Sequence, residues 1–93
     1  MWQIFEHRRV DKQCVVVPQE ALIHYEKWED IAAISGPLGL RQISGFNDEA
    51  LSGTWKGHRS CRLDAQYRVI YRALPDELTF QVMSITAHDS RRP

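Results

Sequence analysis

The sequence predicts an α+β fold in which an N-terminal strand and two helices precede a three-stranded antiparallel meander. Apolar residues alternate with polar ones at the start of the chain and then recur at helical spacing as far as residue 36. Farther along, three strand-like runs follow one another with short turns between them. Since 93 residues suffice for one small hydrophobic core, we expect residues 1–93 to form a single domain.

The first strand and the first helix are predicted over residues 2–7 and 8–17. Trp2 and Ile4 alternate with polar side chains, which is typical of a strand. In the next segment, three apolar side chains share one helical face: Val10, Cys14 and Val17. This helix should end near Val17, because the residue before a proline is biased away from helical backbone angles.

A second helix is predicted over residues 18–36. Pro18 suits its first turn, and Gly36 followed by Pro37 is a typical stop signal. Its expected core stripe repeats at helical spacing: Ala21, Tyr25, Trp28 and Ala32. We expect residues 37–55, which follow this helix, to form a loop.

The three strands of the meander are predicted over residues 57–63, 67–74 and 77–88. Asp64–Ala65 and Pro75–Asp76 have the composition of the turns that would join them. The sequence does not determine where the N-terminal strand pairs with this meander.

Several classes of protein are disfavoured by the composition. No stretch approaches the ~20 apolar residues of a membrane span, and the charged N-terminus lacks the apolar centre of an export signal. Cys14 and Cys61 have no metal-type spacing and are expected to be reduced thiols. We therefore expect a cytoplasmic protein with no membrane partner, and the sequence does not indicate a homo-oligomer.

The charges are unevenly distributed, although the net charge is zero. Residues 1–55 hold five Lys/Arg against eight Asp/Glu, whereas residues 56–93 hold seven against four. Within residues 56–72, five basic side chains are opposed only by Asp64. A polyanion would therefore bind the C-terminal half of the chain.

The catalytic motifs of several enzyme classes are missing. The chain has no phosphate-binding loop, no dinucleotide-binding glycine pattern and no HExxH motif, so no metal or cofactor is predicted. Serine hydrolysis has the residue types but lacks a nucleophile elbow. Metal-free RNA cleavage stays open, because it needs only a proton donor and acceptor and a cation that stabilises the phosphate.

Arg68 and His88 could supply such a site, because the strands that hold them are expected to be neighbours. An arginine can hold two phosphate oxygens, and a histidine can transfer protons near neutral pH. The other candidate RNA contacts are Trp55, Lys56, His58, Arg59, Arg62, Arg72, Arg91 and Arg92. The simpler alternative is that these basic side chains are solvated surface and that Trp55 belongs to the core.

An ordered set of short motifs runs through the C-terminal half. It consists of Leu-x-Gly, Gly-x-x-Ser-x-Arg, an aromatic–Arg pair that opens a strand, and a last strand that ends in histidine. The matching residues are Leu51, Gly53, Gly57, Ser60, Arg62, Tyr67, Arg68 and the segment from Ile85 to His88. This set resembles the RelE/ParE superfamily of bacterial type II toxins.

The resemblance implies a microbial-ribonuclease-type fold and a cytoplasmic toxin that cleaves mRNA in the ribosomal A site. A cognate antitoxin, encoded by an adjacent gene, would hold such a toxin inactive. By position, Arg68 matches the arginine at the scissile phosphate, His88 matches a general acid, and Glu49 matches the base of the YoeB-like branch. Arg59 and Arg62 match basic positions of the second strand in other members.

The chain departs from this pattern around the terminal histidine. Active members often carry an aromatic residue there, whereas Ala87 precedes His88 and DSRRP follows it. The stacking role would fall to Trp55 or Tyr67. This departure and the near-neutral charge keep two alternatives open: a ParE-like inhibitor of DNA gyrase without a catalytic pair, and an inactive binding protein that retains the scaffold.

Overall fold

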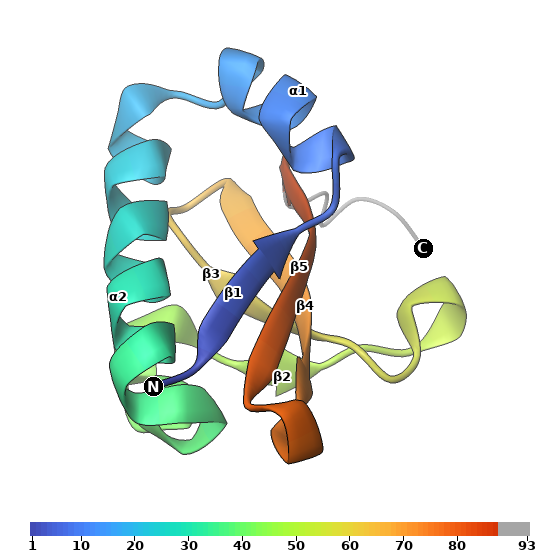
Figure 1. Cartoon of the computed structure of the whole chain (residues 1–93). Helices are drawn as coiled ribbons and strands as arrows, with labels where there is room; N and C mark the ends of the chain where they lie inside the picture. Colours follow the sequence, from blue (N-terminus) through green and yellow to red (C-terminus); the bar gives the residue numbers. More distant parts are fainter. Residues whose placement is uncertain (88–93) are drawn as a thin grey trace.

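The computed structural model describes residues 1–87, which form a five-stranded sheet packed against two helices (Figure 1). The strands are β1 (Gln3–Glu6), β2 (Glu49–Ala50), β3 (Arg59–Arg62), β4 (Tyr67–Leu74) and β5 (Thr79–Ala87). The helices are α1 (Arg9–Val16) and α2 (Gln19–Arg41). Short 3-10 turns occupy Ser44–Phe46, Gly53–Trp55 and Pro75–Glu77. In Figure 1, α2 runs along the sheet and α1 lies across its upper end.

The predicted α+β order and the antiparallel meander are confirmed. Strands β3, β4 and β5 are consecutive antiparallel neighbours in the sheet order β1-β5-β4-β3-β2. The sequence left the partner of the first strand open. Here β1 pairs in parallel with β5, with Ile4 opposite Phe80, and the two helices cross over between the N-terminal strand and the rest of the sheet.

The predicted break of the second helix at Gly36 is confirmed, but the residues directly after it are helical and do not form the predicted loop. Gly36 has φ 68° and ψ −167°, and the helical path resumes after it and continues to Arg41. Pro37 is compatible with this, since a proline that ends one helix also suits the first turn of the next. Glycine is required at the kink, because an added Cβ would lie 2.6 Å from Nε1 of Trp2.

Beyond this helical segment, the predicted loop over residues 37–55 contains three short elements that the sequence pattern does not indicate: two 3-10 turns, Ser44–Phe46 and Gly53–Trp55, and strand β2. Phe46 is buried in a 3-10 turn, and Asn47 ends that turn in the left-handed region with φ 46°. The two-residue strand β2 then pairs with β3, with Glu49 opposite Ser60. A strand of this length has too few residues for a detectable alternation.

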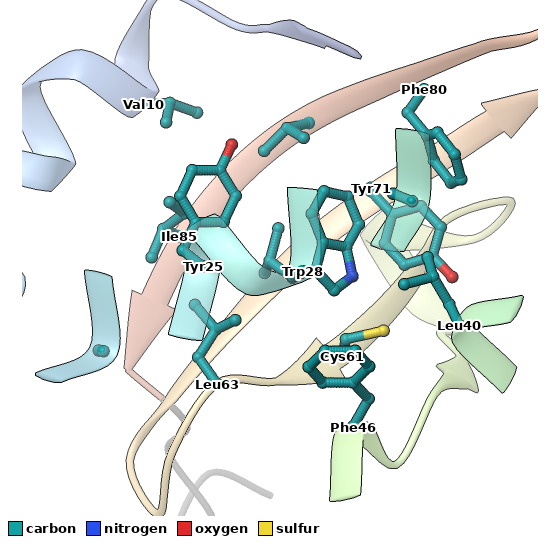
Figure 2. Packing of buried hydrophobic residues seen from close by; sticks show 14 of the residues in the cluster. Val10, Tyr25, Trp28, Leu40, Phe46, Cys61, Leu63, Tyr71, Phe80 and Ile85 are labelled. Atoms are coloured by element: carbon teal, nitrogen blue, oxygen red, sulfur yellow. The ribbon is translucent and has the colours of Figure 1, made fainter. Parts of the chain in front are cut away.

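The predicted helical stripe is confirmed as core, since its members Ala21, Tyr25, Trp28 and Ala32 are all buried. Trp28 is fully buried, and its ring centroid lies 5.2 Å from that of Tyr71 and 5.7 Å from that of Phe80 (Figure 2). These aromatic contacts join α2 to β4 and β5, and aromatic pairs of this kind add to the stabilisation that comes from burial.

A β-bulge in β5 sets the register at the end of the sheet. Ile70 lies opposite Ser84 and Tyr71 lies opposite Val82, so one residue of β5 has no counterpart in β4. Gln13 of α1 compensates for the disrupted ladder: it donates to Ser84 Oγ at 2.9 Å and accepts from the Ile85 backbone N–H at 2.7 Å. Helix α1 therefore stabilises the alignment of the end of β5 with the start of β4.

Candidate functional site

The sheet face opposite the helices carries polar side chains where β3 ends and β4 begins. Cys61 and Val69 are opposite each other and point into the helix-covered core. Because strand side chains alternate between faces, Arg62 and Arg68, which are also opposite each other, point to the uncovered face. The next strand adds Thr86, which is level with Arg68.

A cavity of about 120 Å³ lies at this position. Its lining comes from β2, β3, β4 and the turns beside them: Asn47, Glu49, Ser60, Arg62, Asp64, Ala65, Tyr67 and Arg68. The structure thus brings together Arg68 and Glu49, two of the three predicted catalytic residues. The volume is well below the ~300–1,000 Å³ of typical small-molecule sites, so this cavity fits a single group such as a phosphate and not a whole nucleotide.

Two arginines are the cations that line the cavity. Arg68 is half-buried and donates from Nη1 to Ser60 Oγ at 3.3 Å, whereas Arg62 is exposed. Like charges directly opposite on antiparallel strands destabilise a sheet by about 0.2–1 kcal/mol. An anion between the two guanidinium groups would remove this repulsion and accept hydrogen bonds from both.

The turn before β4 holds the arginine-bearing strand in place. Asp64 Oδ1 accepts the backbone N–H groups of Gln66 at 2.8 Å and Tyr67 at 2.7 Å. This side chain therefore caps a turn and occupies the edge of the cavity at the same time.

The residue before Glu49 points in the opposite direction and anchors β2. The Asp48 side chain is only 1% exposed. Its Oδ1 accepts from Arg59 Nε at 2.5 Å, and its Oδ2 accepts from Cys61 Sγ at 3.1 Å and from the Tyr71 hydroxyl. Since side chains alternate along a strand, this inward anchor directs Glu49 outward to the cavity.

The protonation states around Asp48 support this arrangement. Burial, and then the hydrogen bond to Asp48, raise the pKa of Tyr71. Burial, and then the charge of Asp48, raise the pKa of Cys61. Burial lowers the pKa of Arg59, but the hydrogen bond and charge of Asp48 outweigh this and raise it overall. All three groups therefore stay protonated at neutral pH and donate to one carboxylate.

The predicted RNA contacts do not form one surface. Within residues 1–87, Arg62 is the predicted RNA contact that lines the cavity with Arg68. Arg59 points to the helix side and pairs with Asp48. The half-buried Trp55 packs its ring against His58, with centroids 5.2 Å apart, and is not in the core.

The remaining candidates lie elsewhere or beyond the described residues. Lys56 is exposed, and Arg72, also exposed, donates to Gln81 Oε1 at 2.7 Å. Three predicted residues lie outside the described part of the chain: His88, Arg91 and Arg92. In the observed register Thr86 is level with Arg68 and Ala87 with Tyr67, so β5 reaches the level of the cavity immediately before His88.

The sequence patterns did not indicate that Asp48, Asn47 and Ser60 belong to this region. Ser60 belonged to the recognised motif, and its position two residues before Arg62 on one strand could have indicated a shared face. Among residues 1–87, no three His, Cys, Asp or Glu side chains are grouped so as to hold a metal ion. No helix in this range is long and apolar enough to cross a membrane.

Solved structures of toxins resemble almost the whole chain. A chain of the archaeal RelE–RelB complex from Pyrococcus horikoshii OT3 has a TM-score of 0.75 at 21% identity, covering 96% of this chain and 97% of that one. A YoeB/ParE toxin from Agrobacterium tumefaciens has a TM-score of 0.72 at 14% identity, covering 94% and 99%. This chain has the RelE/ParE toxin fold.

A chain of the YoeB–YefM complex from Staphylococcus aureus agrees, with a TM-score of 0.69 at 15% identity and coverage of 96% and 99%. No protein-family model and no curated protein matches the sequence. The predicted resemblance to RelE/ParE toxins is therefore confirmed at the level of the fold. In that fold, the cavity of Arg62 and Arg68 lies on the sheet face that the helices leave uncovered.

Proposed function

We propose that this chain is the toxin of a type II toxin–antitoxin pair and that it cleaves mRNA on the ribosome without a metal ion. The observation that carries the proposal is the convergence of Arg62, Arg68 and Glu49 on one phosphate-sized cavity. The lining also contains a second carboxylate, Asp64, which caps the turn before β4. Two cations for the phosphate and Glu49 as a base match the needs of phosphodiester cleavage.

Cleavage would begin with attack by the ribose 2′-oxygen on the adjacent phosphorus. Glu49 accepts the 2′-OH proton while the new O–P bond forms, and Arg68 and Arg62 stabilise the added charge on the phosphate oxygens. The bond from phosphorus to the 5′-oxygen then breaks, and His88 gives that oxygen its proton. The products are a cyclic 2′,3′-phosphate and a free 5′-hydroxyl.

His88→Gln tests the proton donor. We expect cleavage to slow about 10²–10⁴-fold, because the leaving oxygen loses its general acid. The rate of mRNA cleavage by the purified chain on programmed ribosomes measures this. Full activity of the variant would remove His88 from the mechanism.

The small cavity also supports dependence on the ribosome. It holds one phosphate-sized group, and in the described part of the chain Tyr67 is the aromatic residue that lines it. Few contacts are then left to orient free RNA, so a second body must hold the mRNA in a reactive conformation. A cytoplasmic toxin of this kind would need an antitoxin partner. Two of the similar structures are named as complexes, RelE–RelB and YoeB–YefM, and a further structure of the second complex is named as a toxin–antitoxin pair.

A ParE-like inhibitor of DNA gyrase is the second candidate. The observation in its favour is that Trp55, one of two predicted stacking residues, packs against His58 and does not line the cavity. Induced expression separates the two functions. Ribonuclease action should halt translation, with mRNA cut only in translated regions, whereas continued translation with poisoned gyrase would favour the alternative.

A further inference from the structure

A second cavity, of about 410 Å³, lies at the opposite end of β3 and β4 from the first. Its lining joins the N-terminus, the kinked end of α2 and the sheet: Trp2, Pro37, Leu38, Arg41, Gly57, Arg59, Arg72, Ala73 and Pro75. The volume falls within the ~300–1,000 Å³ of typical ligand sites, so this cavity can hold a large side chain with its neighbours. We call it the basic–apolar cleft.

The apolar wall of the cleft is a consequence of the kink at Gly36. The Trp2 backbone N–H donates to the Ala33 carbonyl at 2.9 Å, and the Trp2 ring lies where a Cβ of residue 36 would be. The chain then turns into Pro37 and Leu38 beside this ring. Leu38 is 69% exposed, so the wall offers apolar area that a partner can remove from water.

The charged rim of the cleft is positive. Arg41, Arg59 and Arg72 come from three different elements and are opposed, in the described residues that contact them, by the single carboxylate of Asp48. Asp48 is already held by Arg59 at 2.5 Å, whereas Arg41 lies 4.0 Å from it. The Arg41 side chain is 47% exposed, so this guanidinium group and that of Arg72 face solvent with most of their charge uncompensated.

We propose that the basic–apolar cleft binds an acidic peptide segment of a protein partner that carries a large apolar side chain. The apolar side chain packs against Trp2 and Leu38, and flanking carboxylates pair with Arg41 and Arg72. Charge complementarity selects an acidic partner, and the aliphatic wall of Pro37, Leu38 and Ala73 favours a peptide over a nucleic acid strand. The site itself does not depend on RNA cleavage; under the proposed function, the antitoxin is the source of the segment.

The binding test uses the folded chain and a defined probe. The probe is a capped peptide in which a leucine–phenylalanine pair is flanked on each side by two glutamates, titrated into the isotope-labelled protein and followed by NMR. We expect shifts at the Trp2 indole and the Leu38 and Arg72 amides, and weaker binding at high salt. The double variant Arg41→Glu/Arg72→Glu should lose at least about tenfold in affinity.

Matched variants distinguish binding in the cleft from a general effect of charge. Arg8→Glu reverses the charge of an exposed residue at the other end of the molecule and should bind the peptide normally. Leu38→Asp should weaken binding through the apolar wall, and its exposure makes a loss of folding unexpected. Arg68→Ala, which should slow cleavage about 10²–10³-fold, should leave peptide binding unchanged, so failure of the proposed function and failure of this inference are distinguishable.

Three outcomes would overturn the inference. The first is the absence of shifts at millimolar peptide. The second is a set of shifts around Asn47, Arg62 and Tyr67, which would assign the peptide to the first cavity. The third is displacement of the peptide from the cleft by a single-stranded RNA oligonucleotide at lower concentration, which would make the cleft a nucleic-acid site.

Discussion

Arg59 and Arg62 lie three residues apart on β3, yet the two side chains have different environments. Arg59 points to the helix side and pairs with the almost fully buried Asp48. Arg62 points to the uncovered face, where it meets Arg68 at a cavity. A run of basic residues in a strand is thus divided by the alternation of side chains into a structural part and a part that is available to a ligand.

The same division applies to the neighbouring carboxylates Asp48 and Glu49. Substituting them should give the largest difference in stability between an inward and an outward side chain. Asp48→Ala leaves the charge of Arg59 and the Tyr71 and Cys61 donors without their shared acceptor. We expect a loss of about 3–5 kcal/mol in the free energy of unfolding. Glu49→Ala, on the exposed side of β2, should change it by less than about 0.5 kcal/mol. Urea unfolding measures both, and equal effects would contradict the division.

A smaller difference is expected for the two arginines. Arg59→Ala removes the closest cation from the buried Asp48 and leaves it with two neutral donors and with Arg41 at 4.0 Å, which should cost about 1–3 kcal/mol. Arg62→Ala should leave the stability almost unchanged and instead slow cleavage. Thermal unfolding and ribosome-dependent cleavage, measured on both variants, provide the comparison. Loss of cleavage in a fully stable Arg59→Ala variant would show that Arg59 contacts RNA.

Glu29 provides the contrast to Asp48, because it lies among acids and not among donors. Burial, followed by the charges of Glu6, Glu26 and Asp30, raises the pKa of Glu29 to about 7 from its ordinary value of 4.5. A raised pKa favours the protonated folded state, so this contribution to stability is complete below pH 4.5 and is lost as the pH rises through 7.

Glu29→Gln should therefore stabilise the protein at alkaline pH and have no effect under acidic conditions. Since Glu29 is only half-buried, solvent screening reduces the expected gain to about 1 kcal/mol above neutral pH. Urea unfolding at several pH values gives the profile. A stabilisation that does not change with pH would show that neither burial nor the neighbouring acids raise the pKa of Glu29.

The parts of the fold with strong repeating patterns could be predicted from the sequence. The stripe that contains Tyr25 and Trp28 repeats over several helical turns, and the meander strands are bounded by clear turn residues. The kink at Gly36 could not be distinguished from a helix end, because glycine followed by proline has the same local chemistry in both cases. The parallel pairing of β1 with β5 depends on how the two helices place the later strands relative to β1. No local sequence pattern predicts that placement.

The candidate site was predictable only in part. Arg68 and Glu49 belong to the recognised motif and meet at the cavity. The anchoring role of Asp48 depends on three partners from two other strands, separated from it by up to 23 residues, and on a two-residue strand without a periodic signal. The inward orientation of Arg59 could have been inferred from Cys61, which shares its face, once the strand was assigned.

We propose that mRNA is cleaved in the cavity that Arg62 and Arg68 line. The direct test is the rate of mRNA cleavage on programmed ribosomes by purified Arg68→Ala, with Arg72→Ala as a control that removes an equal charge from the same strand. Loss of a group that stabilises the transition-state charge should reduce the rate about 10²–10³-fold in Arg68→Ala. Arg72→Ala should cleave within about twofold of the unmodified chain, since Arg72 does not line this cavity in the described residues. Full activity of a folded Arg68→Ala variant would show that mRNA is not cleaved in this cavity.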